Sequence, residues 1–91
     1  MEIRVRFFAS VREKLRRSEA SCSLPAGATV RDLLDQLCRD YPFLAEVRSA
    51  LSVAVNQEYV DPDHRLSDND EVALIPPVSG GTDVRDRFAA D

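Results

Sequence analysis

The sequence holds one histidine, two cysteines and no apolar run long enough to form a membrane-spanning helix. Such a helix needs roughly 18 consecutive apolar residues, and a secretory signal needs a charged start followed by an apolar stretch, which is missing here. These absences predict a cytoplasmic protein with no membrane span. Cys22 and Cys38 are too few and too far apart for a disulfide framework or a metal site, so we expect both to be buried free thiols.

Side-chain sets for catalysis are missing as well. His64 lies in a polar loop, where a surface turn residue is the usual occupant. Without a His–Cys or Ser–His–Asp set, nucleophilic catalysis by side chains has no candidates. The carboxylates Asp68 and Asp70 flank Asn69, and we interpret all three as turn formers, because such side chains bond to nearby backbone groups.

The length of 91 residues suits one small domain. A hydrophobic fraction of 44% and a charged fraction of 31% are ordinary for a globular protein and too apolar for disorder. Residues 1–17 carry six basic and two acidic side chains, whereas residues 18–91 carry six basic and fourteen acidic ones. This acidic body argues against nucleic acid as a partner. It suits a partner with a basic groove or a solvated surface equally well.

Alternating patterns predict two strands in the first part of the chain. Residues 2–9 alternate between apolar and charged side chains, and residues 19–25 alternate again. The inward positions of the two runs are Ile3, Val5, Phe7, Ala20, Cys22 and Leu24. We interpret the runs as a hairpin, joined by the polar residues 10–17 with room for one helical turn.

The strongest helical pattern covers residues 28–42. Thr29 is a suitable N-cap, and Asp32 stands three residues later, where a carboxylate approximates a capping box and suits the helix dipole. Apolar residues then recur at helical spacing: Val30, Leu33, Leu34, Leu37, Cys38 and Tyr41. This stripe predicts packing against a sheet, and Pro42 is expected to end the helix.

The second part of the chain predicts two more strands. After the ambiguous residues 43–50, strand character resumes over residues 51–60, with Leu51, Val53 and Val55 inward. Turn formers dominate residues 61–70 and predict a loop with one brief strand near Arg65–Leu66. Within residues 71–77, the four successive positions 72–75 are apolar, as expected for a central strand or one whose outer face meets a partner. The order β-β-α-β-β predicts an α+β domain with one sheet packed on one main helix.

A glycine pair, Gly80 and Gly81, follows the last strand. The spacer between the last strand and the glycine pair consists of Pro76, Pro77, Val78 and Ser79. The prolines keep this exit extended and stiff, and the glycines remove side-chain bulk. Most Gly-Gly pairs are ordinary loops, but this position suits a chain end that enters a narrow channel of another protein and offers its carboxyl group there.

These residues carry a resemblance to a known family. The runs RVRFFASVRE and VAVNQEYVDPDHRLSDNDEVALIPPVSGG, with the helix between them, resemble the small subunit of molybdopterin synthase (MoaD). That family belongs with the thiamine sulfur carriers (ThiS) to the ubiquitin-like β-grasp proteins. The resemblance covers residues 1–81 and implies one carrier domain of that fold, with a mixed sheet packed on the main helix.

The resemblance also implies a function. The Gly81 carboxyl would be adenylated by an E1-like enzyme (MoeB-like) that uses ATP and magnesium, and a sulfur donor would then convert it to a thiocarboxylate. The tail would enter the large synthase subunit (MoaE-like), where sulfur passes to cyclic pyranopterin monophosphate during molybdenum cofactor biosynthesis. The chain itself would be a non-catalytic subunit without a cofactor. Gly80 matches the neighbour of the activated glycine, and the expected partner contacts are Phe8, Ile75, Pro76, Pro77, Val78 and Ser79.

The sequence departs from the family beyond Gly81, where the family's chain ends. A peptide bond after Gly81 blocks adenylation, so residues 82–91 are a segment removed by a protease, the start of a fused large subunit, or the mark of a homologue that lost the carrier function. The intact exit favours the first two. Two alternatives stay open: a carrier for thiamine or another thio-metabolite, and a ubiquitin-like interaction module with no activated C-terminus.

Overall fold

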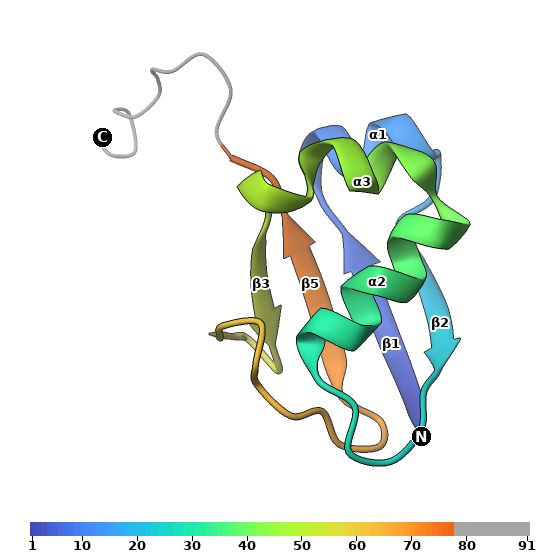
Figure 1. Cartoon of the computed structure of the whole chain (residues 1–91). Helices are drawn as coiled ribbons and strands as arrows, with labels where there is room; N and C mark the ends of the chain where they lie inside the picture. Colours follow the sequence, from blue (N-terminus) through green and yellow to red (C-terminus); the bar gives the residue numbers. More distant parts are fainter. Residues whose placement is uncertain (78–91) are drawn as a thin grey trace.

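The computed structural model describes residues 1–77 and contains one sheet, crossed on one face by a helix (Figure 1). The strands are β1 (Glu2–Phe7), β2 (Glu19–Ser23), β3 (Ser52–Val55), β4 (Glu58–Tyr59) and β5 (Glu71–Ile75). The helices are α1 (Ala9–Leu15), α2 (Val30–Asp40), α3 (Pro42–Val47) and the short 3-10 helix η1 (Arg48–Ala50). None of these helices is long and apolar enough to cross a membrane.

The sheet has the strand order β2-β1-β5-β3-β4. β1 pairs with β2 in antiparallel and with β5 in parallel orientation, and β3 pairs antiparallel with both β5 and β4. The last strand is therefore central, as its apolar sequence predicts. A mixed sheet in this order, packed on one main helix, is the ubiquitin-like β-grasp fold, so the predicted fold class is confirmed.

Helix α2 begins where the sequence predicts. The Thr29 Oγ1 accepts a hydrogen bond from the Asp32 N–H at 3.3 Å, and the Asp32 carboxylate accepts one from the Thr29 N–H at 3.0 Å. This capping box pairs two backbone N–H groups that the helix itself leaves without partners. The predicted stripe is confirmed at Val30, Leu33, Leu34 and Leu37, which are buried, whereas Cys38 and Tyr41 are half-buried at its end.

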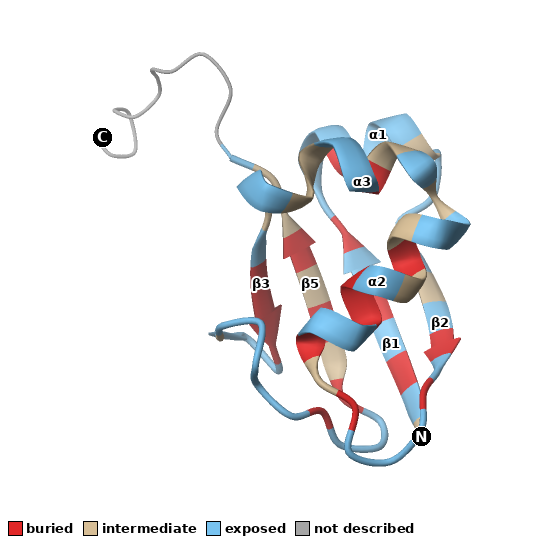
Figure 2. Cartoon of the chain, viewed as in Figure 1, coloured by how far each residue is buried: buried red, intermediate tan, exposed pale blue. Residues whose placement is uncertain are grey.

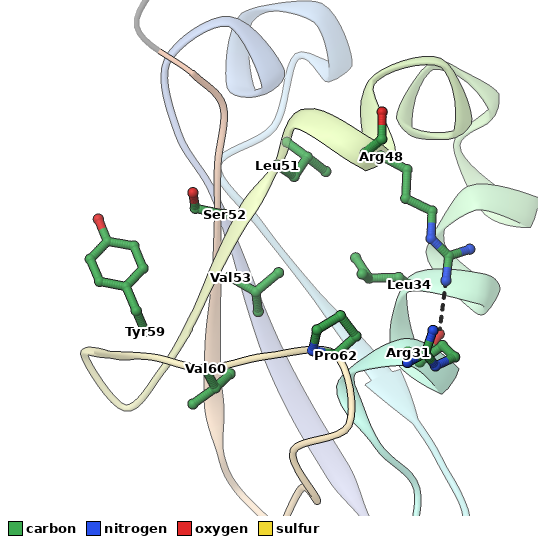
Figure 3. A pocket seen from close by; sticks show the side chains of 10 residues that line it. Arg31, Leu34, Arg48, Leu51, Ser52, Val53, Tyr59, Val60 and Pro62 are labelled. Carbon is green, nitrogen blue, oxygen red and sulfur yellow. Dashed lines mark hydrogen bonds between the residues drawn. The ribbon is translucent and has the colours of Figure 1, made fainter.

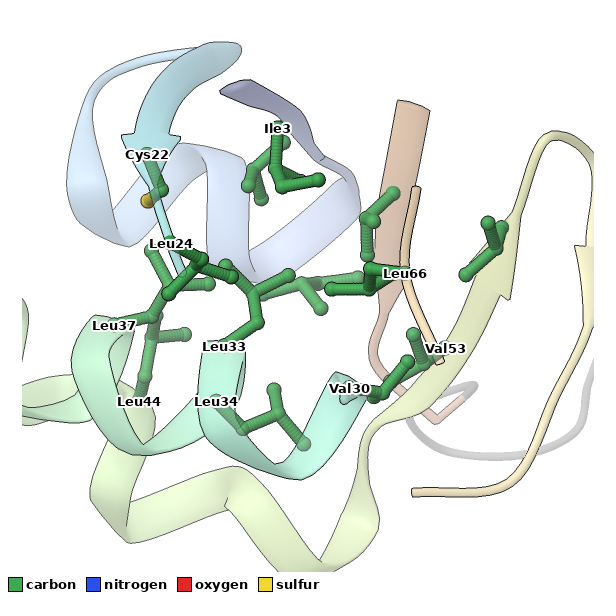
Figure 4. Packing of buried hydrophobic residues seen from close by; sticks show 14 of the residues in the cluster. Ile3, Cys22, Leu24, Val30, Leu33, Leu34, Leu37, Leu44, Val53 and Leu66 are labelled. Atoms are coloured by element: carbon green, nitrogen blue, oxygen red, sulfur yellow. The ribbon is translucent and has the colours of Figure 1, made fainter. Parts of the chain in front are cut away.

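The core lies between α2 and the strand residues that alternate toward it (Figures 2 and 4). Ile3, Val5 and Phe7 of β1 are at most 1% exposed, and so are Val72 and Leu74 of β5. Cys22, Leu24, Val53, Val55 and Leu66 complete the cluster from neighbouring segments. Because alternate residues of the two central strands face α2, the intervening residues must form a second, outer face.

Three local elements differ from the prediction. Where the sequence predicted one helical turn in the connector of residues 10–17, α1 begins at Ala9, inside the predicted strand run, and has seven residues. Its one buried residue is Val11, too few to produce a periodic signal. Pro42 does not only follow α2; it opens α3 at the first helical position, where proline is favoured. Residues 51–60 fold as the hairpin β3–β4 around Asn56 and Gln57, both at positive φ, so the sheet has five strands instead of four.

The remaining predictions fare differently. The brief strand expected near Arg65–Leu66 is a single bridge between Thr29 and Arg65. Cys22 is buried. Its burial, and to a lesser extent the negative charge of Asp40, raise the pKa of its thiol, which suits an inert core residue. Cys38 is also a free thiol but is partly exposed, so its predicted burial holds only in part.

Candidate functional site

The end of β5 is the point from which the predicted reactive segment leaves the domain. β5 ends at Ile75 beside α1 and η1, at the end of the sheet opposite Met1 (Figure 1). Pro76 is half-buried and Pro77 is exposed, and neither has a backbone N–H to continue the ladder. The prolines therefore stop strand pairing and direct the chain away from the sheet. Val78, Ser79, Gly80, Gly81 and the extension 82–91 lie outside the described residues.

The outer face of the sheet carries an apolar patch beside this exit. Ala73 of β5 pairs with Ala54 of β3, and Ala54 pairs with Tyr59 of β4, so the three side chains cross the outer face in one row. Ile75 lies two residues beyond Ala73 on β5, toward the exit, and Phe8 follows the end of β1. Together with Gln57, these five residues line a shallow hollow of about 340 Å³. We call Phe8, Ala54, Tyr59, Ala73 and Ile75 the outer-face patch.

Two residues of the outer-face patch are large and exposed. Phe8 is 36% exposed and Tyr59 is 72% exposed, the only large hydrophobic side chains of residues 1–77 in that class. Ala54 between them is only 6% exposed. Two exposed aromatic rings beside the chain exit make this hollow a candidate interaction site. The structure therefore brings together two of the predicted contact residues, Phe8 and Ile75, and adds three that the sequence prediction missed. Strand alternation could have found Ala73, but Ala54 and Tyr59 depend on the unrecognised hairpin.

Charged residues flank the outer-face patch on its β1 side. The Arg6 guanidinium lies 5.5 Å from the centre of the Phe8 ring and forms an ion pair with Glu71 at 3.1 Å. These contacts hold the Phe8 ring against the sheet, since a cation over an aromatic face attracts it. The patch is thus apolar at its centre and polar at its border, which is the usual composition of a protein–protein interface.

The beginning of β5 is held by a buried polar network. The Asp70 carboxylate, 9% exposed, accepts hydrogen bonds from the Asn56 side-chain amide at 2.9 Å and the Ser67 N–H at 2.8 Å. Asn56 in turn accepts one from the Glu71 N–H at 3.1 Å, which ties the β3–β4 turn to β5. Asp68 accepts a hydrogen bond from the Glu2 N–H at 2.6 Å. Asp70 bonds to nearby backbone, as the sequence predicts, whereas Asp68 bonds to the distant start of β1, which the sequence did not predict. Together they keep the central strand in register.

Other groups with possible chemistry lie elsewhere. Within residues 1–77, no three His, Cys, Asp or Glu side chains lie close enough together to hold a metal ion. His64 is exposed in the loop after β4, and its carbonyl accepts a hydrogen bond from the Val30 N–H. A hollow of about 460 Å³ opens between α2, η1 and β3 (Figure 3). Its two arginines, Arg31 and Arg48, are paired with the carboxylates of Asp63 and Asp35, so the rim of this hollow is neutral.

Comparison with known proteins adds a second line of evidence. The sequence profile of the ThiS family matches residues 5–81, which include the glycine pair. The chain is 45% identical over 83 residues to the molybdopterin synthase sulfur carrier subunit of Chlamydomonas reinhardtii, covering 89% of this chain and all of that protein. It is 40% identical over 81 residues to the protein of the same name from Arabidopsis thaliana, covering 89% and 84% of the two chains.

Solved structures share the fold. A putative molybdopterin converting factor subunit 1 from Pyrococcus furiosus superposes with a TM-score of 0.77 at 31% identity, over 86% of this chain and 99% of that one. Small archaeal modifier protein 1 of Haloferax volcanii gives 0.81 at 29% identity, over 89% and 100%. A Helicobacter pylori complex of subunits 1 and 2 of molybdopterin-converting factor contains a chain with a TM-score of 0.66 at 24% identity, over 89% and 100%.

Proposed function

The chain belongs to the ThiS family, and from this membership we propose that it is the sulfur carrier subunit of a molybdopterin synthase. The observation that carries the proposal is the match to curated carriers of that name over 89% of the chain, together with a family match that includes Gly81. The carrier role needs no catalytic side chain of its own, because the reacting group is the backbone carboxyl of a glycine.

The chemistry follows from the properties of a carboxylate. A carboxylate is a poor electrophile, so an E1-like activating enzyme uses ATP and magnesium to convert the Gly81 carboxyl to an acyl adenylate with release of pyrophosphate. A sulfur donor then displaces adenosine monophosphate, and a thiocarboxylate remains. Its sulfur is ionised at neutral pH and nucleophilic without a neighbouring base. In the large synthase subunit this sulfur passes to cyclic pyranopterin monophosphate, and ATP and magnesium stay with the activating enzyme.

The fold contributes a rigid base for the reactive end. β5 is central in the sheet and paired on both sides up to Leu74, and Ile75 still pairs with Ser52 of β3, so the chain leaves the domain at a fixed point of the outer-face patch. From Ile75 to Gly81 the chain spans six residues, which reach at most about 20 Å when fully extended. A partner seated on the outer-face patch can therefore receive the glycine carboxyl in a site within that radius.

Partner binding at this surface is the structural part of the proposal. The outer-face patch and the exit at Pro76 and Pro77 dock the large synthase subunit, and Val78 and Ser79 continue the contact. The apolar centre and polar border of the patch support this assignment. The Helicobacter pylori structure is a complex of subunits 1 and 2 of molybdopterin-converting factor. We propose that this chain likewise forms a complex with a second, larger subunit.

The bond between Gly81 and Thr82 decides when the carrier can react. Only a free glycine carboxyl can attack ATP, so the peptide bond after Gly81 must be cleaved before the carrier reacts. We would treat three forms with an E1-like enzyme, ATP and a sulfur donor: the chain of 91 residues, a chain ending at Gly81, and the latter with Gly81→Ala. Intact-mass spectrometry would detect the exchange of one oxygen atom for sulfur.

The expected results separate the three forms. The chain ending at Gly81 gains the thiocarboxylate, whereas the 91-residue chain stays unchanged until a protease from its own cell cleaves after Gly81. The Gly81→Ala form reacts poorly, because a methyl group adds bulk where a narrow channel admits none. Failure of the form ending at Gly81 with every activating enzyme tried would overturn the proposal and favour an interaction module whose glycines never react.

A second candidate function is protein modification. It is favoured by the high structural similarity to small archaeal modifier protein 1, with a TM-score of 0.81. In this reaction a lysine amine of a target protein displaces adenosine monophosphate from the Gly81 adenylate, and an isopeptide bond forms. The same mass experiment in a cell extract distinguishes the two: a carrier ends as a thiocarboxylate, and a modifier ends as higher-mass conjugates.

A further inference from the structure

Helix α1 presents a concentration of positive charge on a protein that is otherwise acidic. Arg12, Arg16 and Arg17 line a shallow hollow of about 390 Å³, together with Glu13 and Ser18. We call this surface the arginine hollow. The three ion pairs formed within residues 1–77 involve other arginines, Arg6, Arg31 and Arg48, so none of the three guanidinium groups here has a carboxylate within ion-pair distance among the described residues.

Two of these arginines come from the end of α1 and both line the hollow: Arg12 lies within the helix, and Arg16 is its C-cap. Arg16 ends α1 in the left-handed region with φ 59°, where its N–H donates to the Arg12 carbonyl at 2.9 Å. Glycine is the residue that favours this conformation. An arginine at this position therefore costs backbone strain that a glycine would avoid.

The third arginine is fixed in place. The Arg17 guanidinium donates a hydrogen bond to the Tyr41 hydroxyl at 3.1 Å and lies 5.7 Å from the centre of the Tyr41 ring. A guanidinium held in this way loses less conformational entropy when it binds a carboxylate than a mobile one does. Basic residues near the end of α1 also suit its dipole, but a helix of seven residues does not need three of them for that purpose.

The arginine hollow begins one helical turn from the proposed docking surface, since the Arg12 N–H donates to the Phe8 carbonyl at 3.3 Å. Phe8, a member of the outer-face patch, is the N-cap of α1, and α1 packs against β5, the strand that leads to the exit. In Figure 1, α1 lies at the end of the sheet from which the chain leaves β5. A partner that covers Phe8 and Ile75 and receives the exit therefore extends over α1 with little further reach.

We propose that the arginine hollow binds carboxylate side chains of the large synthase subunit and steers that subunit onto the outer-face patch. The inference rests on the proposed function, because it names the same partner. Guanidinium groups bind carboxylates through paired hydrogen bonds, and such charges act mainly on the rate of association. The acidic remainder of the chain, with fourteen acids against six bases in residues 18–91, disfavours the phosphate backbone of a nucleic acid as the occupant.

The test measures association rates by stopped-flow fluorescence. It uses a chain that ends at Gly81, which keeps every residue of the described fold, and the large synthase subunit from the same organism. Arg16→Glu is compared with Arg65→Glu, an exposed arginine without an ion pair near the start of α2, because both change the net charge by two units. Arg16→Lys keeps the charge, and thermal unfolding checks that all variants are folded.

We expect Arg16→Glu to slow association about threefold to tenfold at about 20 mM salt, and the difference to disappear at about 0.5 M salt. Arg65→Glu and Arg16→Lys should stay within about twofold of the unsubstituted chain. Equal effects of Arg16→Glu and Arg65→Glu would overturn the inference but leave the proposed function intact. Absence of any complex with the unsubstituted chain would overturn both. Binding of a short single-stranded RNA to the unsubstituted chain but not to Arg16→Glu would overturn the inference and assign the hollow to nucleic acid.

Discussion

The two faces of the sheet are made by alternate residues of the same strands, yet they differ in exposure to solvent and in role. On the inner face, Phe7, Val72 and Leu74 are at most 1% exposed and pack under α2. On the outer face, Ala73 and Ile75 remain partly exposed and line a shallow hollow. The inner face thus supplies stability and the outer face supplies recognition, and a change confined to one face should affect one property.

The largest expected effect comes from breaking the inner face. Leu37→Ala should lower the free energy of unfolding by about 2–5 kcal/mol, because Leu37 is fully buried and its truncation leaves a cavity. This is a large part of the roughly 5–15 kcal/mol that stabilises a typical domain. Urea denaturation followed by circular dichroism measures the change, and Leu34→Ala should act in the same direction. An unaltered midpoint for both variants would mean that another face of α2 meets the sheet.

The middle effect comes from adjacent residues of β5 that point to opposite faces. Ile75→Asp should weaken the complex with the large synthase subunit at least about tenfold, because it places a charge in the outer-face patch beside the exit. The same change should alter the free energy of unfolding by no more than about 1 kcal/mol. Isothermal titration calorimetry measures the affinity.

Leu74→Ala is the matched control for this pair, since Leu74 is fully buried on the inner face. It should destabilise the fold by about 2–4 kcal/mol and leave the affinity of the remaining folded protein unchanged. Val78→Asp, in the exit beyond the described residues, should weaken the complex as Ile75→Asp does. Full affinity of both Asp variants would show that the large subunit does not use this surface.

The difference between the faces also explains what the sequence predicted well. β1 and α2 were predicted closely because each has one buried stripe, and the stripe is a local property of the sequence. α1 was underestimated because Val11 is its one buried residue. The hairpin at Asn56 and Gln57 was missed because glycine, the usual signal for positive φ at the second turn position, is replaced by glutamine.

The candidate site shows the same division. Phe8 and Ile75 were proposed from the sequence, and both belong to the outer-face patch. Ala54 and Tyr59 join them only through strand register, which depends on pairings between distant segments that no local pattern encodes. The arginine hollow was present in the sequence as an excess of positive charge in residues 1–17, but the position of α1 beside the exit was needed to give that charge a role.

The smallest expected effect is on the outer face itself. Glu71→Gln removes the ion pair with Arg6, whose side chains are 34% and 51% exposed. Exposed pairs contribute little, so the loss of unfolding free energy should stay below about 1 kcal/mol and should shrink further at high salt. Urea denaturation at two salt concentrations checks this. A loss above about 2 kcal/mol would show that the outer face also holds the fold together.

The parallel pairing of β1 with β5 has a mechanical consequence. The two strands are neighbours joined through four residue pairs, and the chain enters at the lower end of one and leaves at the upper end of the other. A pulling force between the N-terminus and the C-terminal exit therefore runs along both strands and loads their hydrogen bonds in shear, so that they must break together and not one after another. The C-terminal segment can thus be pulled from a narrow protein channel without unfolding the domain to which it is attached.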